Sequence, residues 1–577
     1  MTTIDAGALP GTFSEAVFRK CGYTGLKVDI AAQRLIKANA VAAVVFLLVG
    51  GLMGVAVALT RWPAVHLLPA EWFYLVLTGH GANVLLFWII FFEIAILYFA
   101  SAILLNSRLA APKFAWLGFV LMIVGALMAN YAVLRGDSSV MFTSYPPMMA
   151  SSWFYLSLIL FAVGALIGVA VFFGTLVIAR AERTYEGSIP LVTFGALTAA
   201  IIAVFTIASG AIILIPTWLW SLGLISNIDP LMYKVIWWGM GHSSQQINVS
   251  AHVSVWYLIA ALVVGAKPLS EKVSRTAFLM YILFLQLASA HHLLAEPGMS
   301  SEWKIINTSY MMYLAVMGSM IHGLTVPGAI EAAQRRNGFR KGWFEWLQKA
   351  PWGNPAFSGM FLSLVMFGFI GGISGVVLGT EQLNVLMHNT IYVPGHFHGT
   401  VVAGTTLAFM AVTYLLLPLI FQREVIWPKL AKWQPYLFGI GAGGISLFMM
   451  GAGTLGVARR HWDITLTDAA HAFEYAPGAF LMMGLNGIFA LIAGLGGALY
   501  ILITVGTVLF GKKLDTAGAQ PMQFPLHAQG PHAASHYGSE PAVKLPGTIV
   551  LVTIFFVSFV LYYFVNWKYL SDLWLFR

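Results

Sequence analysis

The chain has 577 residues, of which 59% are hydrophobic and only 9% are charged. Soluble globular proteins carry roughly 25% charged residues, so this composition excludes a soluble enzyme and indicates a membrane protein. The single cysteine, Cys21, excludes an internal disulfide framework and a thiolate metal cluster. The N-terminus shows no short apolar segment followed by a cleavage site, so we expect no cleaved signal peptide.

Apolar segments recur along the chain from about residue 40 to its end. Each is long enough to cross a bilayer, which takes roughly 20 residues in a helix, and several are longer, which predicts tilt or extension beyond the bilayer. We therefore expect an all-α, polytopic membrane helical bundle. The thirteen expected transmembrane helices are 40–60, 72–104, 113–136, 152–180, 191–216, 232–265, 276–294, 306–328, 354–378, 386–420, 434–458, 476–510 and 546–570.

The spans divide the chain into four parts. Residues 1–39 form a basic N-terminal arm, and residues 40–510 hold a core of twelve helices. Residues 511–545 form a polar loop, and residues 546–577 hold the thirteenth helix and the C-terminus. Histidines in the polar loop could bind a metal, but solvated loop histidines are the favoured interpretation. These histidines are His527, His532 and His536.

Lysine and arginine residues concentrate in alternate loops, which predicts the orientation of the chain in the membrane. The rich set contains the N-terminal arm and the loops around 335–349 and 423–432, and the opposite set contains few basic residues. We therefore expect a cytoplasmic N-terminus, a cytoplasmic 511–545 loop and an outer C-terminus. The net charge of +9 reflects this topology, so the expected surroundings are a lipid bilayer, and no nucleic-acid partner is expected.

Polar side chains inside the expected spans mark a candidate site, because such residues are costly at membrane depth. The sixth span contains GHSSQQINVSAHVSVWY at 241–257. With the orientation fixed, histidines from several spans fall in one layer near the outer leaflet, and imidazole is a common ligand of haem iron, copper and non-haem iron. The six histidines are His80, His242, His291, His292, His396 and His398.

The spacing of these histidines predicts three sites. His396 and His398 project about 200° apart on a helix, so they would ligate two cofactors on opposite faces, and His80 could complete a pair with one of them. The adjacent residues His291 and His292 could share a centre with His242. This arrangement gives a bis-histidine haem, a mono-histidine haem and a three-histidine metal site. Arginine side chains could hold haem propionates, although an ordinary interfacial pair is the alternative. The two arginines are Arg459 and Arg460.

The motifs resemble subunit I of the haem-copper oxidoreductases, and specifically the B family of oxygen reductases. They are TGHGANVLLFW at 78–88, GH at 241–242, HHLLAEPG at 291–298, HNTIYVPGHFH at 388–398 and ARR at 458–460. The resemblance implies His80 and His398 as ligands of a low-spin haem b, and His396 as the ligand of a high-spin haem, b-type favoured and a-type possible. It also implies a second metal, copper favoured over iron. The second-metal ligands would be His242, His291 and His292, and the propionate contacts His388, Arg459 and Arg460.

The same resemblance implies how electrons arrive. No cupredoxin or cytochrome c domain is present in the sequence. A second subunit carrying a cupredoxin (CuA-like) or cytochrome c domain is therefore expected, with an outside donor such as cytochrome c. The expected location is the inner (plasma) membrane of a bacterium or archaeon.

The sequence departs from the oxygen reductases at the expected metal site. Those enzymes carry a tyrosine four residues after the first metal-binding histidine, where this chain has Gln246. Position i+4 faces the same way one turn along a helix, but glutamine cannot be oxidised. Oxygen needs four electrons at once, whereas two molecules of nitric oxide need two electrons and two protons. The substitution therefore favours a nitric oxide reductase derived from an oxidase.

Further polar residues suggest how protons move. An aspartate of the oxidases is Asn384 here, and a threonine of their proton path is Met311, which favours weak or absent proton pumping. We expect a proton path along one stripe of the sixth span, with interhelical hydrogen bonding as the alternative. The stripe contains Gln246, Ser250, Ser254 and Tyr257. His252 lies beside the stripe, and Glu93 is an intramembrane acid without an assigned role.

Three other functions stay open. The first is an oxygen reductase that uses Tyr257 or Tyr392 in place of the missing tyrosine. The second is a secondary transporter with functional histidines and no haem. The third is a haem sensor without turnover.

Overall fold

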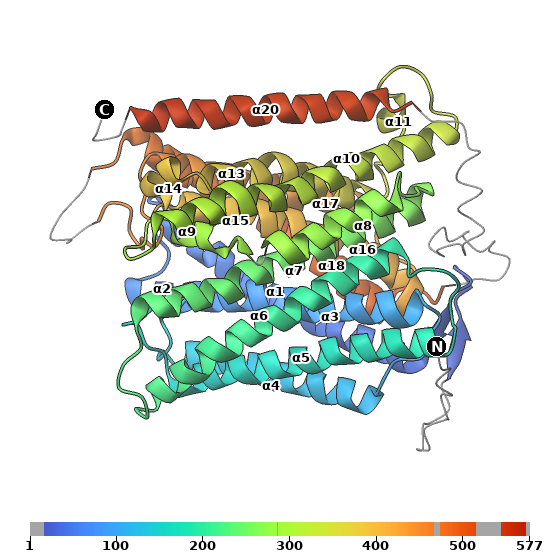
Figure 1. Ribbon diagram of the computed structural model, residues 1–577, viewed down its shortest axis with the longest axis horizontal. Coiled ribbons are helices and arrows are strands. Elements are labelled where there is room, and N and C mark those ends of the chain that lie inside the picture. Colours follow the sequence, from blue (N-terminus) through green and yellow to red (C-terminus); the bar gives the residue numbers. More distant parts are fainter. Residues whose placement is uncertain (1–16, 23, 286, 467–473, 515–543, 573–577) are drawn as a thin grey trace.

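The computed structural model describes residues 17–22, 24–285, 287–466, 474–514 and 544–572. Twelve of the described helices are long and apolar enough to cross a membrane, and they run side by side in one bundle (Figure 1). Eight are uninterrupted α-helices: α1 (Ile30–Arg61), α4 (Pro112–Leu134), α5 (Ser152–Ala181), α6 (Leu191–Ser221), α7 (Pro230–Val264), α17 (Pro428–Thr454), α18 (Pro477–Phe510) and α20 (Pro546–Ser571).

The other four spans contain π-helical turns; the label η marks both π-helical and 3₁₀ turns. The first is Ala70–Ile103, made of α2 (Ala70–Gly81), η1 (Ala82–Trp88), α3 (Ile89–Tyr98) and η2 (Phe99–Ile103). The second is Ser301–Arg336, made of α9 (Ser301–Ile305), η5 (Ile306–Met312) and α10 (Tyr313–Arg336). The third is Pro355–Leu378, made of α12 (Pro355–Met366), η6 (Phe367–Gly372) and α13 (Ile373–Leu378). The fourth is Tyr392–Phe421, made of α15 (Tyr392–Phe397), η7 (His398–Thr406), α16 (Leu407–Leu416) and η8 (Leu417–Phe421). Two short helices, α11 (Glu345–Gln348) and α14 (Glu381–Met387), lie between spans.

The expected seventh helix, 276–294, is not continuous, and this part of the prediction is wrong. The segment begins as α8 (Glu271–Met280), continues as the π-turn η3 (Tyr281–Leu285) and ends in the 3₁₀ turn η4 (Ser289–Leu293). A 3₁₀ turn is tighter than an α-helical turn and is used in short pieces, often at functional positions. Here it carries two of the six histidines.

The N-terminal arm is more ordered than the sequence predicts. Strand β1 (Phe18–Lys20) pairs antiparallel with β2 (Lys27–Asp29), with Phe18 opposite Asp29. Helix α1 then begins at Ile30, well before the expected start at residue 40. Asp29 explains this early start, because its carboxylate caps the helix by accepting from the backbone N–H groups of Ala31 and Ala32.

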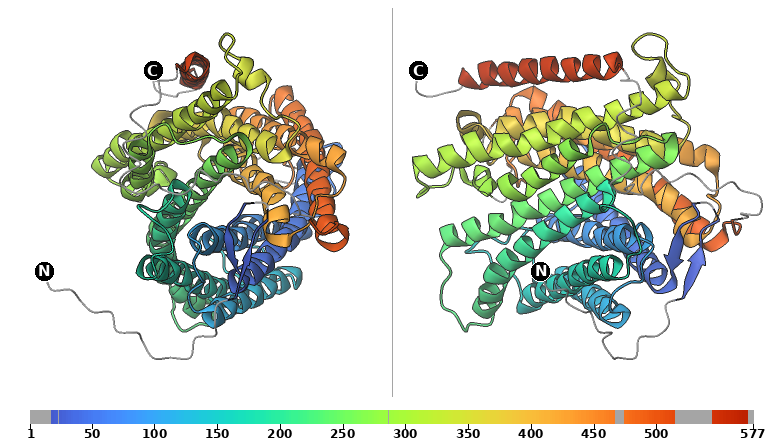
Figure 2. Two further views of the ribbon diagram at one scale, coloured as in Figure 1. Left: turned by 90° about the vertical axis from the view of Figure 1, so that its right-hand side faces the viewer. Right: turned by 45° about the vertical axis from the view of Figure 1, so that its right-hand side comes forward.

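Helix α20 lies at the edge of the bundle, as the end-on view shows (Figure 2). The fully buried Glu331 of α10 contacts the first turn of α20. The Glu331 carboxylate accepts from the backbone N–H groups of Gly547 and Thr548, and it pairs with Arg335 at 2.8 Å. The negative charge lies at a helix N-terminus, where the helix dipole favours it. The end of α20 and the β-hairpin lie at opposite ends of the bundle (Figure 1).

Helix α7 holds the polar sequence of the sixth span inside the bundle. It packs against α6, α10, α12 and α16, so nearly all its side chains from Asn248 to Leu262 are buried. Its polar side chains therefore face other helices rather than lipid. This position brings them to the interior of the molecule, where the histidines of the other spans also lie.

Candidate cofactor and metal centre

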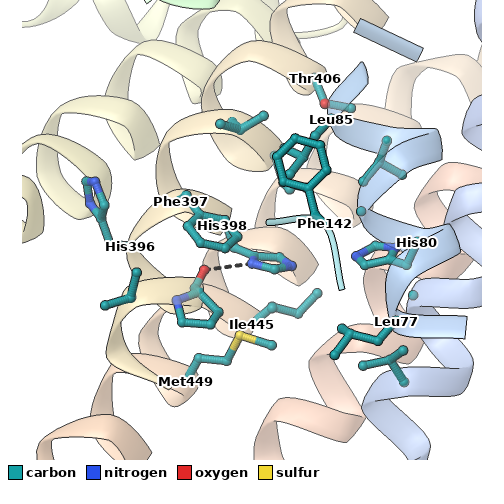
Figure 3. Close-up of a pocket in the computed structure, with 18 of the residues that line it drawn as sticks. Leu77, His80, Leu85, Phe142, His396, Phe397, His398, Thr406, Ile445 and Met449 are labelled. Carbon is teal, nitrogen blue, oxygen red and sulfur yellow. Dashed lines mark hydrogen bonds between the residues drawn. The ribbon is translucent and has the colours of Figure 1, made fainter. Parts of the chain in front are cut away.

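His80 on α2 and His398 at the start of η7 face each other across the interior (Figure 3). Their ring centroids are 6.4 Å apart and their planes differ by 21°. Two imidazoles bound to one metal ion from opposite sides, each at about 2.0–2.1 Å, have centroids roughly 6.3 Å apart. The spacing therefore fits a bis-histidine haem.

Backbone carbonyls fix the orientation of both rings. Nδ1 of His80 lies 2.8 Å from the carbonyl oxygen of Gly50, and Nδ1 of His398 lies 2.7 Å from that of Pro394. Each Nδ1–H donates to its carbonyl, which leaves Nε2 free as a ligand atom. The absence of a side chain at Gly54 makes space for the His80 ring, because a Cβ at this position would lie 2.6 Å from Cε1 of the ring.

His396 points to the other side of the same segment, as its two-residue separation from His398 predicts (Figure 3). Ser374 on α13 lies 3.0 Å from its Nδ1. The Ser374 hydroxyl donates to backbone carbonyls of η6, so its oxygen accepts from Nδ1–H of His396. Nε2 is again the free ligand atom, and this ring can serve a second haem.

Three histidines form a cluster that can hold a metal ion. His242 on α7 and the adjacent pair His291 and His292 on η4 each offer one nitrogen, and these three atoms all lie within 4.8 Å of one another. Nδ1 of His242 and Nε2 of His292 are 3.0 Å apart. The carbonyl oxygen of Ala288 accepts from Nδ1 of His291, which leaves Nε2 of that ring for the metal. Three imidazoles are a donor set for copper, iron or zinc.

Two aromatic residues that sequence reasoning missed hold this cluster. The Trp238 indole stacks on the His292 ring with centroids 3.8 Å apart and planes 7° apart. Its Nε1–H donates to the hydroxyl of Tyr145 at 2.8 Å. Trp238 lies one turn before His242 on α7, so i,i+4 spacing was an available signal. Tyr145 comes from a distant loop, and the sequence carries no signal for it.

Gln246 lies at the metal cluster, as its spacing predicts. Its side-chain Nε2 is 3.0 Å from Nε2 of His242. If His242 binds metal through Nδ1, its Nε2 carries a proton and needs an acceptor. The Gln246 amide supplies one when its carbonyl oxygen is turned toward the ring. In that orientation, glutamine at this position would position His242 without binding the metal.

A cavity connects the haem and metal positions, and basic residues line one end of it. The cavity is bordered by His80, His398, His396, Arg61, Arg459 and Arg460. Burial lowers the pKa of Arg459 to about 10, so this residue is still charged at neutral pH. None of the ion pairs between described residues includes Arg459 or Arg460. Partly buried cations without acidic partners among the described residues fit the propionate groups of a haem.

Arg61 and His388 complete this end of the cavity. Arg61 donates to the backbone carbonyls of His461 and Arg459 at 3.1 and 3.2 Å. Arg61 is only 4% exposed, and the sequence analysis did not identify it as part of the site. Burial, together with the charge of Arg459, lowers the pKa of His388 to about 4. His388 is therefore neutral at pH 7, and its ring N–H can donate a hydrogen bond to a carboxylate.

We expect Arg459→Ala to weaken haem retention by roughly 10- to 100-fold, the range for outer partners of a bound metal group. Removing the guanidinium would leave a propionate charge without its counter-ion. The measurement is haem content per chain after dilution of the purified protein, with Arg135→Ala as control, because Arg135 is an exposed residue of the same membrane face. Equal haem retention in both variants would contradict the assignment.

The expected proton stripe is only partly joined by hydrogen bonds. The Ser250 hydroxyl has no partner among the described residues, and the Ser254 hydroxyl donates to the backbone of its own helix. The Tyr257 hydroxyl, in contrast, contacts three side chains from two other helices, α8 and α10. It lies 3.0 Å from Ser274 Oγ, 3.0 Å from His322 Nδ1 and 2.7 Å from Thr325 Oγ1. The sequence analysis did not identify these three partners.

Known proteins are similar to this chain in fold and in sequence. The family described as "Cytochrome C and Quinol oxidase polypeptide I" matches residues 34–484. The chain is 29% identical over 503 residues to cytochrome c oxidase subunit 1 of Thermus thermophilus, covering 84% of this chain and 86% of the relative. It is 21% identical over 472 residues to quinol oxidase subunit 1 of Bacillus subtilis, covering 77% and 68%. A haem-copper terminal oxidase dimer solved by cryo-EM superposes with a TM-score of 0.80 at 25% identity, covering 94% of this chain and 92% of that chain.

The fold and the site define a multi-pass membrane protein built around imidazole ligands for redox cofactors. The chain belongs to the Cytochrome C and Quinol oxidase polypeptide I family, the catalytic subunit I of haem-copper oxidases. The family implies haems and a copper centre, and it makes the chain an oxidoreductase subunit rather than a secondary transporter. The predicted helical membrane bundle is confirmed.

Proposed function

We propose that this chain is the catalytic subunit of a respiratory nitric oxide reductase, derived from the B-family oxidases. It would convert two molecules of nitric oxide, with two electrons and two protons, into nitrous oxide and water. The observation that carries the proposal is Gln246, 3.0 Å from the imidazole of His242. This position holds an oxidisable tyrosine in the oxygen reductases that the sequence resembles.

The proposed ligand assignment follows the geometry of the three sites. His80 and His398 would hold a low-spin haem b, and His396 a high-spin haem, b-type favoured and a-type possible. The three-histidine cluster would hold copper, with iron as the alternative. The haem and the second metal supply the electrons and bind the substrate when they are present. Arg459, Arg460 and His388 would hold the propionates.

The protein side chains would orient these groups and deliver protons. The Gln246 amide, whose Nε2 lies 3.0 Å from Nε2 of His242, would keep His242 in the tautomer that ligates through Nδ1 once it is turned so that its oxygen accepts from Nε2–H. The Tyr257 hydroxyl and its three partners would pass protons toward the cluster from the cytoplasmic side, along the predicted stripe of Gln246, Ser250, Ser254 and Tyr257. Because the hydroxyls of Ser250 and Ser254 do not bond to one another, ordered water would have to bridge them.

Partner subunits would supply the electrons. We expect a second subunit with a cupredoxin (CuA-like) or cytochrome c domain, reduced by an outside donor such as cytochrome c. The proposed topology has a cytoplasmic N-terminus and an outer C-terminus in a bacterial or archaeal plasma membrane. The expected polar loop, 511–545, lies almost wholly outside the described residues, as do His527, His532 and His536.

An oxygen reductase is the second candidate function. It is favoured by the relatives, which are named as cytochrome c and quinol oxidases. Such an enzyme would need another oxidisable side chain. Tyr392 is fully buried on α15 and its hydroxyl lies 2.9 Å from that of Tyr562. Tyr257 is the other candidate.

The test is turnover of the purified, reduced holoenzyme with nitric oxide and with oxygen, measured side by side on electrodes. We expect nitrous oxide formation to exceed oxygen uptake by at least about tenfold. Gln246→Leu should lower nitric oxide turnover roughly 10- to 100-fold, because it removes the hydrogen-bond partner that orients a metal ligand. Fast oxygen reduction by the unaltered enzyme would overturn the proposal in favour of the oxidase.

A further inference from the structure

Glu93 is a carboxylic acid buried in the membrane-spanning part of the bundle. It lies on α3, and only 6% of its surface is exposed. None of the ion pairs between described residues includes it. A buried carboxylate without a counter-ion is strongly unfavourable. Such a residue within a membrane therefore indicates function rather than packing.

The hydrogen-bond partner of Glu93 is an amide on the central helix α7. With its Nδ2 turned toward Glu93, Asn248 donates to Glu93 Oε1 at 2.8 Å and to the carbonyl oxygen of Ser244 at 3.2 Å. The opposite orientation would set the amide oxygen against two acceptors. The bond leaves Oε2 of Glu93 as the atom that can carry a proton. Asn248 can stabilise the acid when that proton leaves.

Asn248 links the acid to the central cavity. Asn248, Ser244 and Gln245 line this cavity on the α7 side. Leu85 and Thr406, labelled in Figure 3, line the same cavity. The carboxyl group is thus separated from the cavity by one side chain.

Few other ionisable groups face Glu93. Helix α3 packs against α1, α5, α6 and α7. Residues 38–60 of α1, 156–179 of α5 and the whole of α6 contain no ionisable side chain. Helix α7 contributes buried ionisable groups, and of these His252 lies one turn beyond Asn248, with its Nδ1 2.9 Å from Thr405 Oγ1. The others are Tyr233, His242 and Tyr257.

We propose that Glu93 is a proton-holding residue that exchanges a proton with the central cavity during turnover, and that Asn248 positions its carboxyl group. The acid releases a proton from Oε2 into the cavity, where the reduction of substrate consumes it, and it becomes a carboxylate held by Asn248 Nδ2–H. It then regains a proton from water. This inference rests on the proposed function only in that the reaction consumes protons, which oxygen reduction also does.

The test is infrared difference spectroscopy of the purified holoenzyme between its oxidised and reduced states. We expect a change in the carboxylic C=O stretch in the unaltered enzyme, which is absent in Glu93→Gln although haem content is unchanged. Asn248→Leu should keep the band but shift its frequency, because it removes the hydrogen-bond donor. Turnover should fall at least about tenfold in Glu93→Gln, with the same cofactors bound. Glu71→Gln, at an exposed position on the preceding helix α2, should change neither property.

A band that persists in Glu93→Gln, or turnover within about twofold of the unaltered enzyme, would overturn the inference. If Glu93→Gln fails to assemble, a redox-dependent band that does not shift in Asn248→Leu would overturn it equally. The infrared signal does not depend on the substrate. A Glu93 band in an enzyme that reduces oxygen and not nitric oxide would therefore refute the proposed function and leave the role of Glu93 intact.

Discussion

Replacing His398 by alanine should remove the low-spin haem and leave the high-spin haem in place, whereas replacing His396 should do the reverse. The two side chains lie two residues apart but point to opposite sides of one segment (Figure 3). His398 shares its site with His80, at a centroid separation of 6.4 Å. In either variant we expect turnover to fall by more than the roughly 10- to 100-fold typical of residues that only orient a ligand.

The measurement is the reduced-minus-oxidised optical spectrum with haem content from the pyridine haemochrome. His252→Gln is the matched control, because it also removes a buried imidazole from the bundle. Its Nδ1 bonds to Thr405 and its other nitrogen has no partner among the described residues, so both haems should remain. Loss of the same haem in the His396 and His398 variants would contradict the two-sided arrangement.

Helical periodicity explains why much of the site was predictable. The angle between His396 and His398, and the i+4 position of Gln246 relative to His242, follow from the helix alone. The length of the apolar segments likewise predicted twelve of the spans. The sequence also predicted that the motifs would gather in one layer, because charge asymmetry fixes the direction in which each span runs.

Contacts between distant segments explain what could not be predicted. Ser374 on α13 contacts His396 on α15, and Tyr145 from a loop contacts Trp238 on α7. The sequence separations of these pairs follow no local helical period. Arg61 lies near a membrane end of α1, and its position there does not predict its hydrogen bonds to the backbone carbonyls of His461 and Arg459. The break in the seventh span is similar, because hydropathy measures apolar length and does not detect a 3₁₀ turn.

Removing one imidazole from the three-histidine cluster should abolish turnover with little effect on either haem. Of the three, His291 is the sharpest choice, because its Nδ1 is held by Ala288 and it bonds to no other side chain of the cluster. In His291→Ala, two imidazoles would remain for an ion that we propose is bound by three, and we expect the second metal to be lost. Metal analysis should show that ion missing, with both haems retained, and turnover should drop by at least about a thousandfold, beyond the effect of losing an orienting partner alone.

The same variant separates a catalytic metal from a structural one. If His291→Ala retains its second metal and its turnover, the cluster does not hold the reacting centre, and the role of Gln246 beside it falls too. If the metal is lost but the optical spectra of both haems persist, the folded protein shows that the ion is needed for chemistry rather than assembly. Gln246→Leu, which keeps all three imidazoles, should retain the metal and lose only part of the activity. That difference is expected from the geometry, since Gln246 contacts His242 through Nε2, whereas Nδ1 of that ring faces His292.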